Sequence, residues 1–361
     1  MTTGPVTPAS PAPVWDVING FASYWALSAA LDLGLFDALA ADAGGLDAGR
    51  LAKAVGAAGP GTVTVLAETL VALDMLSAEE DRFRLTPAAE RYLVSASPAS
   101  MTALVRYSPG PPAAWPGLAE TVRTGAPDPA VTADLAELYP ALVRATGPTQ
   151  TGVATGVAAE LERRGLWPER PVIVDLGCGS GAWLTALLRT RPQGTAVAVD
   201  LPNVLPIAER ALADAGLGER VTAVAGDYLA AELPVAAADV VVLAHVLRAE
   251  PPERARRLLA RAVELAGADG VVVVVDYWRP DPATPATGED RGAICAAARH
   301  ELLLSLTMLA STAGLGVSVA DLHTWAEAVG AEPDGSFEPV PRQHVRLIRS
   351  GNRSRTPEAT S

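Results

Sequence analysis

The chain has 361 residues, of which 49% are hydrophobic, and it carries a formal net charge of −13. This length exceeds what one hydrophobic core usually organises, so we expect two domains. The acidic balance argues against a nucleic-acid partner, because phosphate contacts require a basic face. No stretch approaches the roughly 18 uninterrupted apolar residues of a membrane helix, so we expect no membrane partner either.

The two ends of the sequence and its cysteines favour a cytoplasmic protein with disordered tails. Residues 1–13 lack the basic and apolar regions of a signal peptide. Together with residues 350–361 they have the composition of disordered segments. The two cysteines, Cys178 and Cys295, cannot build a disulfide framework, which is typical of a reducing compartment. We interpret Cys178 as a small buried filler.

Residues 14–100 predict a mainly helical winged-helix domain. The first helix is apolar nearly all round, as helices buried against another chain often are. A second helix, a "GAAGPG" break and a third helix follow, then a hairpin and a helix opening at Thr86 and Pro87. Such a module binds DNA or forms a dimer. The candidate recognition helix, residues 62–73, contains Glu and no Arg or Lys, which favours dimerisation.

Residues 101–170 predict helices broken by proline that lead into the second domain and form one wall of a cleft. Tyr139 in this segment is a candidate for the substrate pocket, with a place in the core as the alternative.

Residues 171–349 alternate between strand and helix, which predicts an α/β domain with a Rossmann-like, doubly wound parallel sheet. Strands are expected at 171–177, 194–201, 221–228, 238–245 and 269–278, and helices at 182–191, 204–216 and 251–266. Ligands bind such sheets at the carboxyl ends of the strands. Polar side chains stand at or near five of these ends: Asp175, Asp200, Asp227, His245 and Asp276.

The segment "VDLGCGSGAW" places Gly177, Gly179 and Gly181 between a strand and a helix. Taken alone, this loop also fits a dinucleotide fingerprint. Asp175, however, would repel a pyrophosphate and suits a ligand with ammonium and sulfonium groups. Asp200 is placed to accept hydrogen bonds from ribose hydroxyls, and Gly226–Tyr228 suits an adenine. The alternative is that these aspartates only cap the helices that follow.

With "VDLGCGSG", "AVDLPNV", "AGDYL" and "LTMLAST…DLHTWAEAVGAE" in this order, residues 14–349 resemble the two-domain S-adenosylmethionine-dependent O-methyltransferases. This family includes the hydroxyindole and caffeate enzymes and actinomycete relatives that act on secondary metabolites. The resemblance implies a domain-swapped homodimer through the N-terminal helices and a small-molecule acceptor. It also implies S-adenosylmethionine as cofactor, held by Asp175, Gly177, Gly179, Gly181, Asp200, Leu201, Gly226, Asp227, Tyr228, Ala244 and His245.

The sequence departs from this family at the catalytic histidine. The family has "LHDW" after the fourth strand, whereas this chain reads "VLRAEP", so Arg248 occupies the histidine position. An arginine cannot act as a general base because its pKa stays above about 12. His245, three residues earlier, is then a substitute base, a residue that shapes the cofactor pocket, or a strand-end residue without a chemical role.

Without that base, alignment of an acidic acceptor with the cofactor and Arg248 can supply the acceleration. His300 is a second candidate base, with a solvent or dimer contact as the alternative, and Met308 is a candidate pocket residue or a core residue. A metal held by His245 and His300 is disfavoured because no carboxylate motif accompanies them. Methylation of nitrogen or carbon, and a non-methylating reaction such as decarboxylation, hydroxylation or a pericyclic step, stay open.

Overall fold

The structure is a computed structural model that describes residues 10–107, 110–281 and 291–351. It divides into two compact units, residues 1–108 and residues 109–361. The predicted tails, 1–13 and 350–361, lie largely outside the described residues. The segment 101–170, predicted as a separate linker and pocket wall, falls mostly within the second unit. No helix in the described ranges has the length and apolarity needed to cross a membrane.

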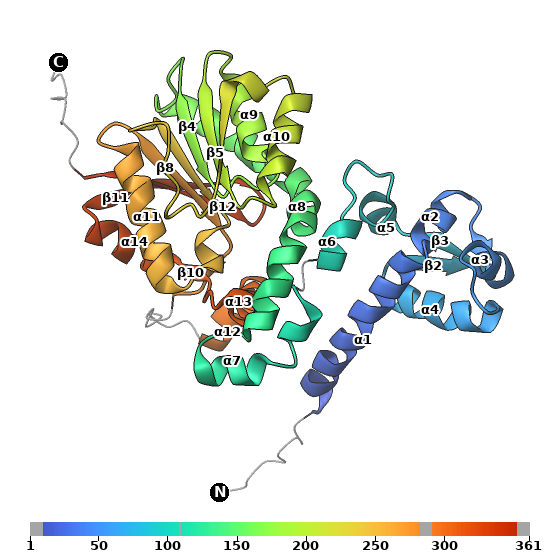
Figure 1. Ribbon diagram of the computed structural model, residues 1–361. Coiled ribbons are helices and arrows are strands. Elements are labelled where there is room, and N and C mark those ends of the chain that lie inside the picture. The colour runs from blue at the N-terminus through green and yellow to red at the C-terminus, as the bar shows by residue number, and fades with distance from the viewer. Residues whose placement is uncertain (1–9, 108–109, 282–290, 352–361) are drawn as a thin grey trace, which may run out of the picture. The chain divides into compact units, whose positions relative to one another are not determined.

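The first unit has the winged-helix arrangement that the sequence predicts (Figure 1). Thr86 caps the last predicted helix by accepting a hydrogen bond from the Ala89 amide at 3.3 Å, with Pro87 in the first turn. The wing is a small antiparallel sheet in the order β1-β3-β2. The elements are α1 (Ala12–Asp32), α2 (Leu35–Ala40), β1 (Leu46–Asp47), α3 (Ala48–Ala54), α4 (Pro60–Ala72), β2 (Leu76–Glu79), β3 (Arg82–Leu85), α5 (Pro87–Tyr92) and α6 (Thr102–Tyr107).

Helix α1 exposes large apolar side chains over most of its length. Trp15, Phe21 and Trp25 are 56%, 71% and 50% exposed in the single chain, while the buried residues of the helix, Ser28 and Ala30, lie near its end. Soluble monomers rarely expose so continuous an apolar surface. The first half of α1 therefore has the surface of a helix that packs against another chain.

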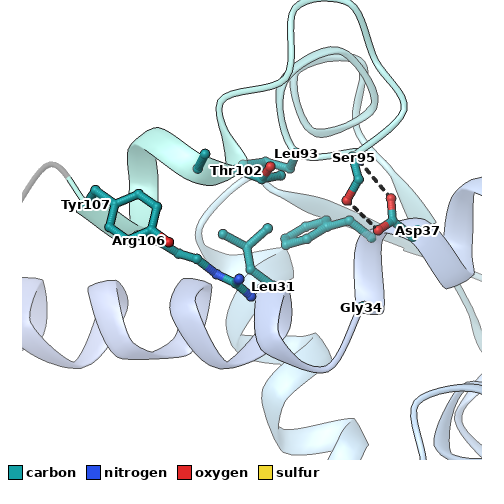
Figure 2. Close-up of a pocket in the computed structure, with 10 residues that line it drawn as sticks. Leu31, Gly34, Asp37, Leu93, Ser95, Thr102, Arg106 and Tyr107 are labelled. Carbon is teal, nitrogen blue, oxygen red and sulfur yellow. Dashed lines mark hydrogen bonds between the residues drawn. The ribbon is translucent and has the colours of Figure 1, made fainter. Parts of the chain in front are cut away.

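The same unit has a hollow of about 160 Å³ between the end of α1, α2 and α6. Figure 2 shows the residues that line it. Asp37 accepts hydrogen bonds from the Ser95 amide at 2.8 Å and the Ser95 hydroxyl at 2.7 Å. Arg106 pairs with Asp32 at 2.6 Å. These contacts tie the residues that follow α5 back to the first two helices.

The second unit is built on a seven-stranded sheet in the order β11-β12-β8-β7-β4-β5-β6. Its strands are β4 (Val172–Leu176), β5 (Thr195–Asp200), β6 (Val221–Ala225), β7 (Val240–Ala244), β8 (Val271–Asp276), β11 (Ala331–Val340) and β12 (Gln343–Ser350). The five strands predicted to be parallel are confirmed. The antiparallel pair β11 and β12 was not predicted, because β11 is polar, contains two prolines and is interrupted by register shifts.

Helices cover both faces of this sheet (Figure 1). Part of α8 (Pro129–Arg163), α9 (Ala182–Thr190) and α10 (Leu205–Asp214) pack on one face. On the other face lie α11 (Pro252–Ala266) and α14 (Val319–Ala328). The unit also contains α7 (Leu118–Thr124), α12 (Arg291–Ala297), α13 (Arg299–Thr312), the short ladder of β9 (Trp278–Arg279) and β10 (Val317–Ser318), and the 3-10 turns η1 (Pro112–Ala114), η2 (Gly218–Arg220) and η3 (Leu247–Ala249).

Helix α8 continues through Pro140 and Pro148, so the prediction that these prolines break the helix is wrong. Proline lacks an amide hydrogen, which leaves the carbonyl four residues earlier without its helical partner. For Pro140 this is the Ala136 carbonyl, which accepts a hydrogen bond from the Asn203 side chain at 2.9 Å. The loop after β5 thus supplies the donor that α8 lacks.

Candidate active site

The loop of residues 177–181, called the glycine loop below, follows β4 and leads into α9. Gly177, Gly179 and Gly181 have φ of 93°, 54° and 72°, a region that favours glycine. A Cβ on Gly177 would lie 2.6 Å from Val246 Cγ1. The amides of Gly177 and Cys178 both donate to the Val199 carbonyl, at 2.9 and 3.1 Å. The backbone itself therefore requires the glycines that the sequence singles out.

Asp175, just before this loop, is a buried carboxylate with unused hydrogen-bonding capacity. It is 1% exposed, and neither of its oxygens has a hydrogen-bond partner among the described residues. Burial, and then the neighbouring charge of Asp200, raise its pKa to about 8. Buried carboxylates are normally paired, so this site fits a ligand that brings a positive charge. Burial also raises the pKa of the Cys178 thiol well above its usual range, in keeping with a filler role.

Asp200, at the end of β5, is oriented by two backbone amides. Its Oδ2 accepts from Gly179 and its Oδ1 from Leu201, both at 2.7 Å. Burial outweighs these hydrogen bonds and raises the pKa of this carboxyl. Leu201, 38% exposed, presents an apolar surface beside it. A polar group and an apolar surface are thus adjacent, as a ribose with an attached base requires.

The loop after β6 is held by the start of α11. Gly226 has φ of 150°. Arg254 Nη2 lies 3.2 Å from both oxygens of Asp227, and Arg254 Nε donates to Glu250 Oε2 at 2.6 Å. The other oxygen of Glu250 accepts from the Tyr228 hydroxyl at 2.5 Å. Sequence reasoning missed Glu250 and Arg254, which fix both candidate adenine residues in place.

These contacts shift the pKa values of the loop. Burial alone would raise the pKa of Asp227, but hydrogen bonds from the Leu229 amide and Arg254 outweigh it, so the pKa lies below its usual range. Burial and the charge of Glu250 raise the pKa of the Tyr228 phenol. Tyr228 therefore stays neutral at any ordinary pH.

His245 follows β7 with φ of 60°, which is uncommon for a residue other than glycine. Its Nε2 lies 3.2 Å from Gln150 Oε1, an atom to which the Trp183 indole also donates, at 3.3 Å. Its Nδ1 is buried, 3.9 Å from Asp276 Oδ1. Ala244, just before it, is half-buried. Gln150 lies on α8, so this helix and the end of β7 meet at His245.

Arg248, in η3, is held against the end of β8. Its backbone amide donates to Asp276 Oδ2 at 3.2 Å, and its Nε lies 3.6 Å from Asp276 Oδ1, beyond hydrogen-bond reach. Its guanidinium carbon lies 5.1 Å from the centre of the Tyr277 ring. Nε and Nη1 are buried without a hydrogen-bond partner in the described part of the chain. Arg248 thus has donors left for a ligand.

Tyr277 is the centre of the group formed by His245, Arg248, Asp276, Tyr277 and His300, called the Tyr277 cluster below. The His245 ring stacks on it at 5.0 Å, and the His300 ring meets it edge-on at 5.6 Å. The Tyr277 hydroxyl accepts from Gln343 Nε2 at 2.7 Å. All three predicted catalytic candidates, His245, Arg248 and His300, therefore come together. Sequence reasoning missed Tyr277, although it directly follows the all-valine strand that ends in Asp276.

The two candidate pocket residues differ. Burial raises the pKa of the Tyr139 phenol to about 12, with further contributions from Glu250 and Asp200 and an opposing one from Arg248. Tyr139 therefore lies near all three of these charged residues. Met308 is half-buried on α13, and its carbonyl accepts a hydrogen bond from the Thr312 hydroxyl at 2.9 Å, a contact within the helix.

Comparison with known proteins identifies the family. An O-methyltransferase domain model matches residues 163–330, and an O-methyltransferase dimerisation domain model matches residues 15–95. The chain is 32% identical to the N,N-dimethyltransferase OxyT of Streptomyces rimosus, over 79% of this chain and 83% of that protein. It is 30% identical to the 3-hydroxy-5-methyl-1-naphthoate 3-O-methyltransferase of Streptomyces sahachiroi, over 89% of both. The chain belongs to the O-methyltransferase family.

The fold agrees with this assignment. The crystal structure of human N-acetylserotonin methyltransferase in complex with S-adenosylmethionine has a TM-score of 0.76 to this O-methyltransferase, with 22% identity over 97% of this chain and all of that one. The predictions of the family, of the α/β fold with its N-terminal winged-helix domain, of an enzyme and of S-adenosylmethionine as cofactor are confirmed. In the described ranges of this O-methyltransferase, no three His, Cys, Asp or Glu side chains gather as a metal site would need.

Proposed function

We propose that this O-methyltransferase methylates an acidic hydroxyl group of a small aromatic or polyketide-type secondary metabolite. The observation that carries the proposal is Arg248, whose buried Nε and Nη1 have no hydrogen-bond partner in the described ranges. Relatives support the substrate class. They include the naphthoate 3-O-methyltransferase named above and the tetracenomycin polyketide synthesis 8-O-methyltransferase of Streptomyces glaucescens, 28% identical over 75% of this chain.

When bound, S-adenosylmethionine supplies an electrophilic methyl group on a positively charged sulfur. In this chain Asp175 would face a positive group of the cofactor, since its carboxylate is buried and has no hydrogen-bond partner among the residues that the structure describes. Asp200 and Leu201 would hold the ribose and adenine, with Asp227 and Tyr228 completing the adenine side. Ala244 and His245 would form the far wall. The residues present therefore fit the cofactor.

On the acceptor side, Arg248 would bind the anionic form of the substrate. Asp276 and the Tyr277 ring fix the guanidinium, and the buried surroundings strengthen its hydrogen bonds to an anion. A nearby positive charge lowers the pKa of an acidic hydroxyl and thus favours its nucleophilic anion. Arg248 cannot accept the proton itself. We infer that orientation and charge, without a base at this position, activate the acceptor.

We also propose that the enzyme is a homodimer through its N-terminal helices. The exposed apolar face of α1 and the matched dimerisation domain support this assembly. Light scattering of the full-length protein should give twice the mass of one chain. Deleting residues 1–40 should give monomers or aggregates with exposed apolar surface, and a monodisperse full-length monomer would contradict the proposal.

The methylation proposal is tested with methyl-labelled cofactor and two acceptors of similar size, 4-cyanophenol and 4-methylphenol. These share the ring and the hydroxyl and differ in the acidity of that hydroxyl, because the cyano group withdraws electrons from the ring. At pH 7 we expect kcat/KM for 4-cyanophenol to exceed that for 4-methylphenol by at least tenfold, or about 1.4 kcal/mol. Equal values, or a preference for 4-methylphenol, would refute the selection of an acidic hydroxyl by Arg248.

Methylation of an amine is the second candidate, because OxyT is named as an N,N-dimethyltransferase. A neutral amine needs no base before it attacks the methyl group. Analysis of the labelled product distinguishes the two, since label on nitrogen rather than oxygen would favour this alternative.

A further inference from the structure

Gln150 orients its side-chain amide through a contact with Trp183. The indole nitrogen of Trp183 can only donate a hydrogen bond. It lies 3.3 Å from Gln150 Oε1. Swapping the amide oxygen and nitrogen of Gln150 would set two donors against each other, so this atom is the oxygen. The same oxygen is therefore available only as an acceptor to any other neighbour.

That neighbour is His245. Its Nε2 lies 3.2 Å from Gln150 Oε1 and must donate to it, so Nε2 carries a hydrogen. The neutral ring then has its lone pair on Nδ1. This atom is buried, 3.9 Å from Asp276 Oδ1, and makes no hydrogen bond to any described residue. The nitrogen that could accept a proton is thus enclosed within the protein.

We infer that Gln150 is a positioning residue that fixes His245 as an Nε2–H donor and thereby prevents it from acting as the base of the methyl transfer. The exclusion of His245 as a base rests on the proposed function, whereas the assignment of the hydrogen to Nε2 does not. Of the three roles open to His245 from the sequence, this removes the substitute base and leaves two, a residue that shapes the cofactor pocket and a strand-end residue without a chemical role.

Other contacts hold the ring in the same place. His245 stacks on Tyr277 with an angle of 29° between the ring planes, and its backbone amide donates to the Val275 carbonyl at 2.7 Å. The charged and titratable groups around it are Asp276, Arg248 and, across Tyr277, His300. Asp276 lies on the Nδ1 side, so a second proton on the ring would add there and would leave Nε2 protonated. Both charge states of His245 thus keep Nε2 as a donor.

The consequence concerns the proton of the acceptor. If His245 cannot take it, the proton must pass to His300, the second candidate base, or to solvent, or the substrate must enter as the anion, with Arg248 stabilising the charge. Gln150 belongs to α8, the same helix that carries Tyr139 and that places Gly147 against Ser180 of the glycine loop, where an added Cβ would lie 2.7 Å from Ser180 Oγ. Through Gln150, α8 therefore determines which ring nitrogen of His245 carries the hydrogen.

The test uses long-range ¹H–¹⁵N correlation spectra of full-length protein labelled at histidine, which report which ring nitrogen carries hydrogen. The chain has four histidines, and His245→Asn identifies the signals of His245. We expect a hydrogen on Nε2 near neutral pH, in either the neutral ring or the imidazolium. A neutral His245 with hydrogen on Nδ1 only would overturn the inference.

Two variants sharpen the result. Gln150→Leu removes the acceptor and should shift His245 toward a mixture of tautomers, whereas Gln150→Glu keeps an acceptor oxygen and should preserve the Nε2–H signal. Gln193→Leu is the matched control, because Gln193 contacts Arg170 and should leave His245 unchanged. An unchanged spectrum in Gln150→Leu would also overturn the inference. None of these measurements needs an acceptor, so they stand even if the proposed methyl transfer fails.

Discussion

The loops after β4, β5 and β6 and the loops after β7 and β8 lie along one edge of the same sheet, yet they are built differently. The first group, the cofactor side, depends on backbone amides and glycines that hold carboxylates such as Asp200. The second, the acceptor side, depends on a cation, two histidines and an aromatic ring that are packed on one another. Under the function proposed above, one side would receive positive charge and the other negative charge.

This difference indicates where a substitution can change specificity for the acceptor without weakening the binding of the cofactor. The cofactor side is made of three loops that the sequence marks by their glycines and aspartates, although Asp200 and Arg254 hold them from 21 and 27 positions away. The acceptor side is assembled from segments that carry no such marks, since Gln150, Tyr277, His300 and Gln343 come from four separate parts of the chain. A substitution such as that at position 248 can alter the acceptor side alone. Substitutions at four positions test this division.

The largest effect is expected for Arg248→Ala, which removes the only predicted partner of the acceptor anion. We expect kcat/KM for an acidic acceptor to fall more than a hundredfold, or about 3 kcal/mol, because two buried donors and a charge are lost. Arg248→Lys should recover only part of the lost kcat/KM, since the compact ammonium of lysine cannot donate the paired hydrogen bonds of a planar guanidinium. Binding of S-adenosylhomocysteine, measured by calorimetry, should stay unchanged. A parallel loss of cofactor affinity would show that the two sides are not separate.

Asp175→Asn should affect the opposite side. The carboxylate must be ionised to bind a positive group, so wild-type affinity for S-adenosylhomocysteine should rise as the pH increases toward the pKa of about 8. At pH 8 the variant should bind about 30-fold more weakly, or about 2 kcal/mol, and with a flatter pH dependence. Calorimetric titrations from pH 6 to pH 8 check this, and a pH-independent wild-type affinity would contradict it.

The raised pKa of Asp175 also makes the free energy of unfolding depend on pH. Between the usual aspartate pKa of about 3.9 and about 8, the folded protein without cofactor binds more protons at Asp175 than the unfolded chain does. The free energy of unfolding contributed by this group therefore falls as the pH rises through that interval. Asp175→Asn should lessen this decline, which thermal unfolding at several pH values measures.

Asp200→Ala should weaken binding of S-adenosylmethionine and of its demethylated product by about 1–3 kcal/mol, because ribose hydroxyls and the amides of Gly179 and Leu201 lose their acceptor. Calorimetry with both ligands measures the loss. Asp239→Ala is a poor control because Asp239 accepts from the Val172 amide in β4. Asp134→Ala, on the exposed side of α8, is the better one. Unchanged affinity in Asp200→Ala would refute its role at the ribose.

The smallest effect is expected for His245→Ala, with kcat/KM reduced less than tenfold and cofactor affinity nearly intact. A general base would contribute about a hundredfold or more and would give a pH–rate limb near neutrality that the substitution removes. The pH–rate profiles of both proteins decide between these outcomes. A loss above a hundredfold at unchanged cofactor affinity would show that the base has moved from position 248 to position 245.

On the cofactor side, the sequence marks the glycine loop and the aspartates at the strand ends because these signals are local, whereas Glu250 and Arg254 carry no such signal. A glycine at positive φ, a strand of branched residues and an aspartate at its end are each specified within a few neighbouring positions. The acceptor side is harder to predict. Gln150 stands in "TGPTQTGVATG", where neither a periodic pattern nor a motif marks it. Its partners His245 and Trp183 lie 95 and 33 positions away, so only the folded chain brings them together.

Two parts of the fold were not predicted for the same reason, namely that each depends on a partner distant in the sequence. Continuation of α8 through Pro140 depends on Asn203, which is 67 positions from the carbonyl that it satisfies. Strand β11 is recognised by its pairing with β12 rather than by its own composition. Local propensity is overridden in both cases by a partner distant in the sequence.

Pro140 gives a warning for attempts to engineer a more robust enzyme. Replacing a proline in the middle of a helix with alanine is a common stabilising choice. Here the restored amide of Pro140→Ala would compete with Asn203 for the Ala136 carbonyl, and Asn203 lies three residues after Asp200. A gain in helix stability would then come with a looser loop after β5. The proline makes α8 dependent on Asn203, and that dependence joins the helix to the loop that follows Asp200.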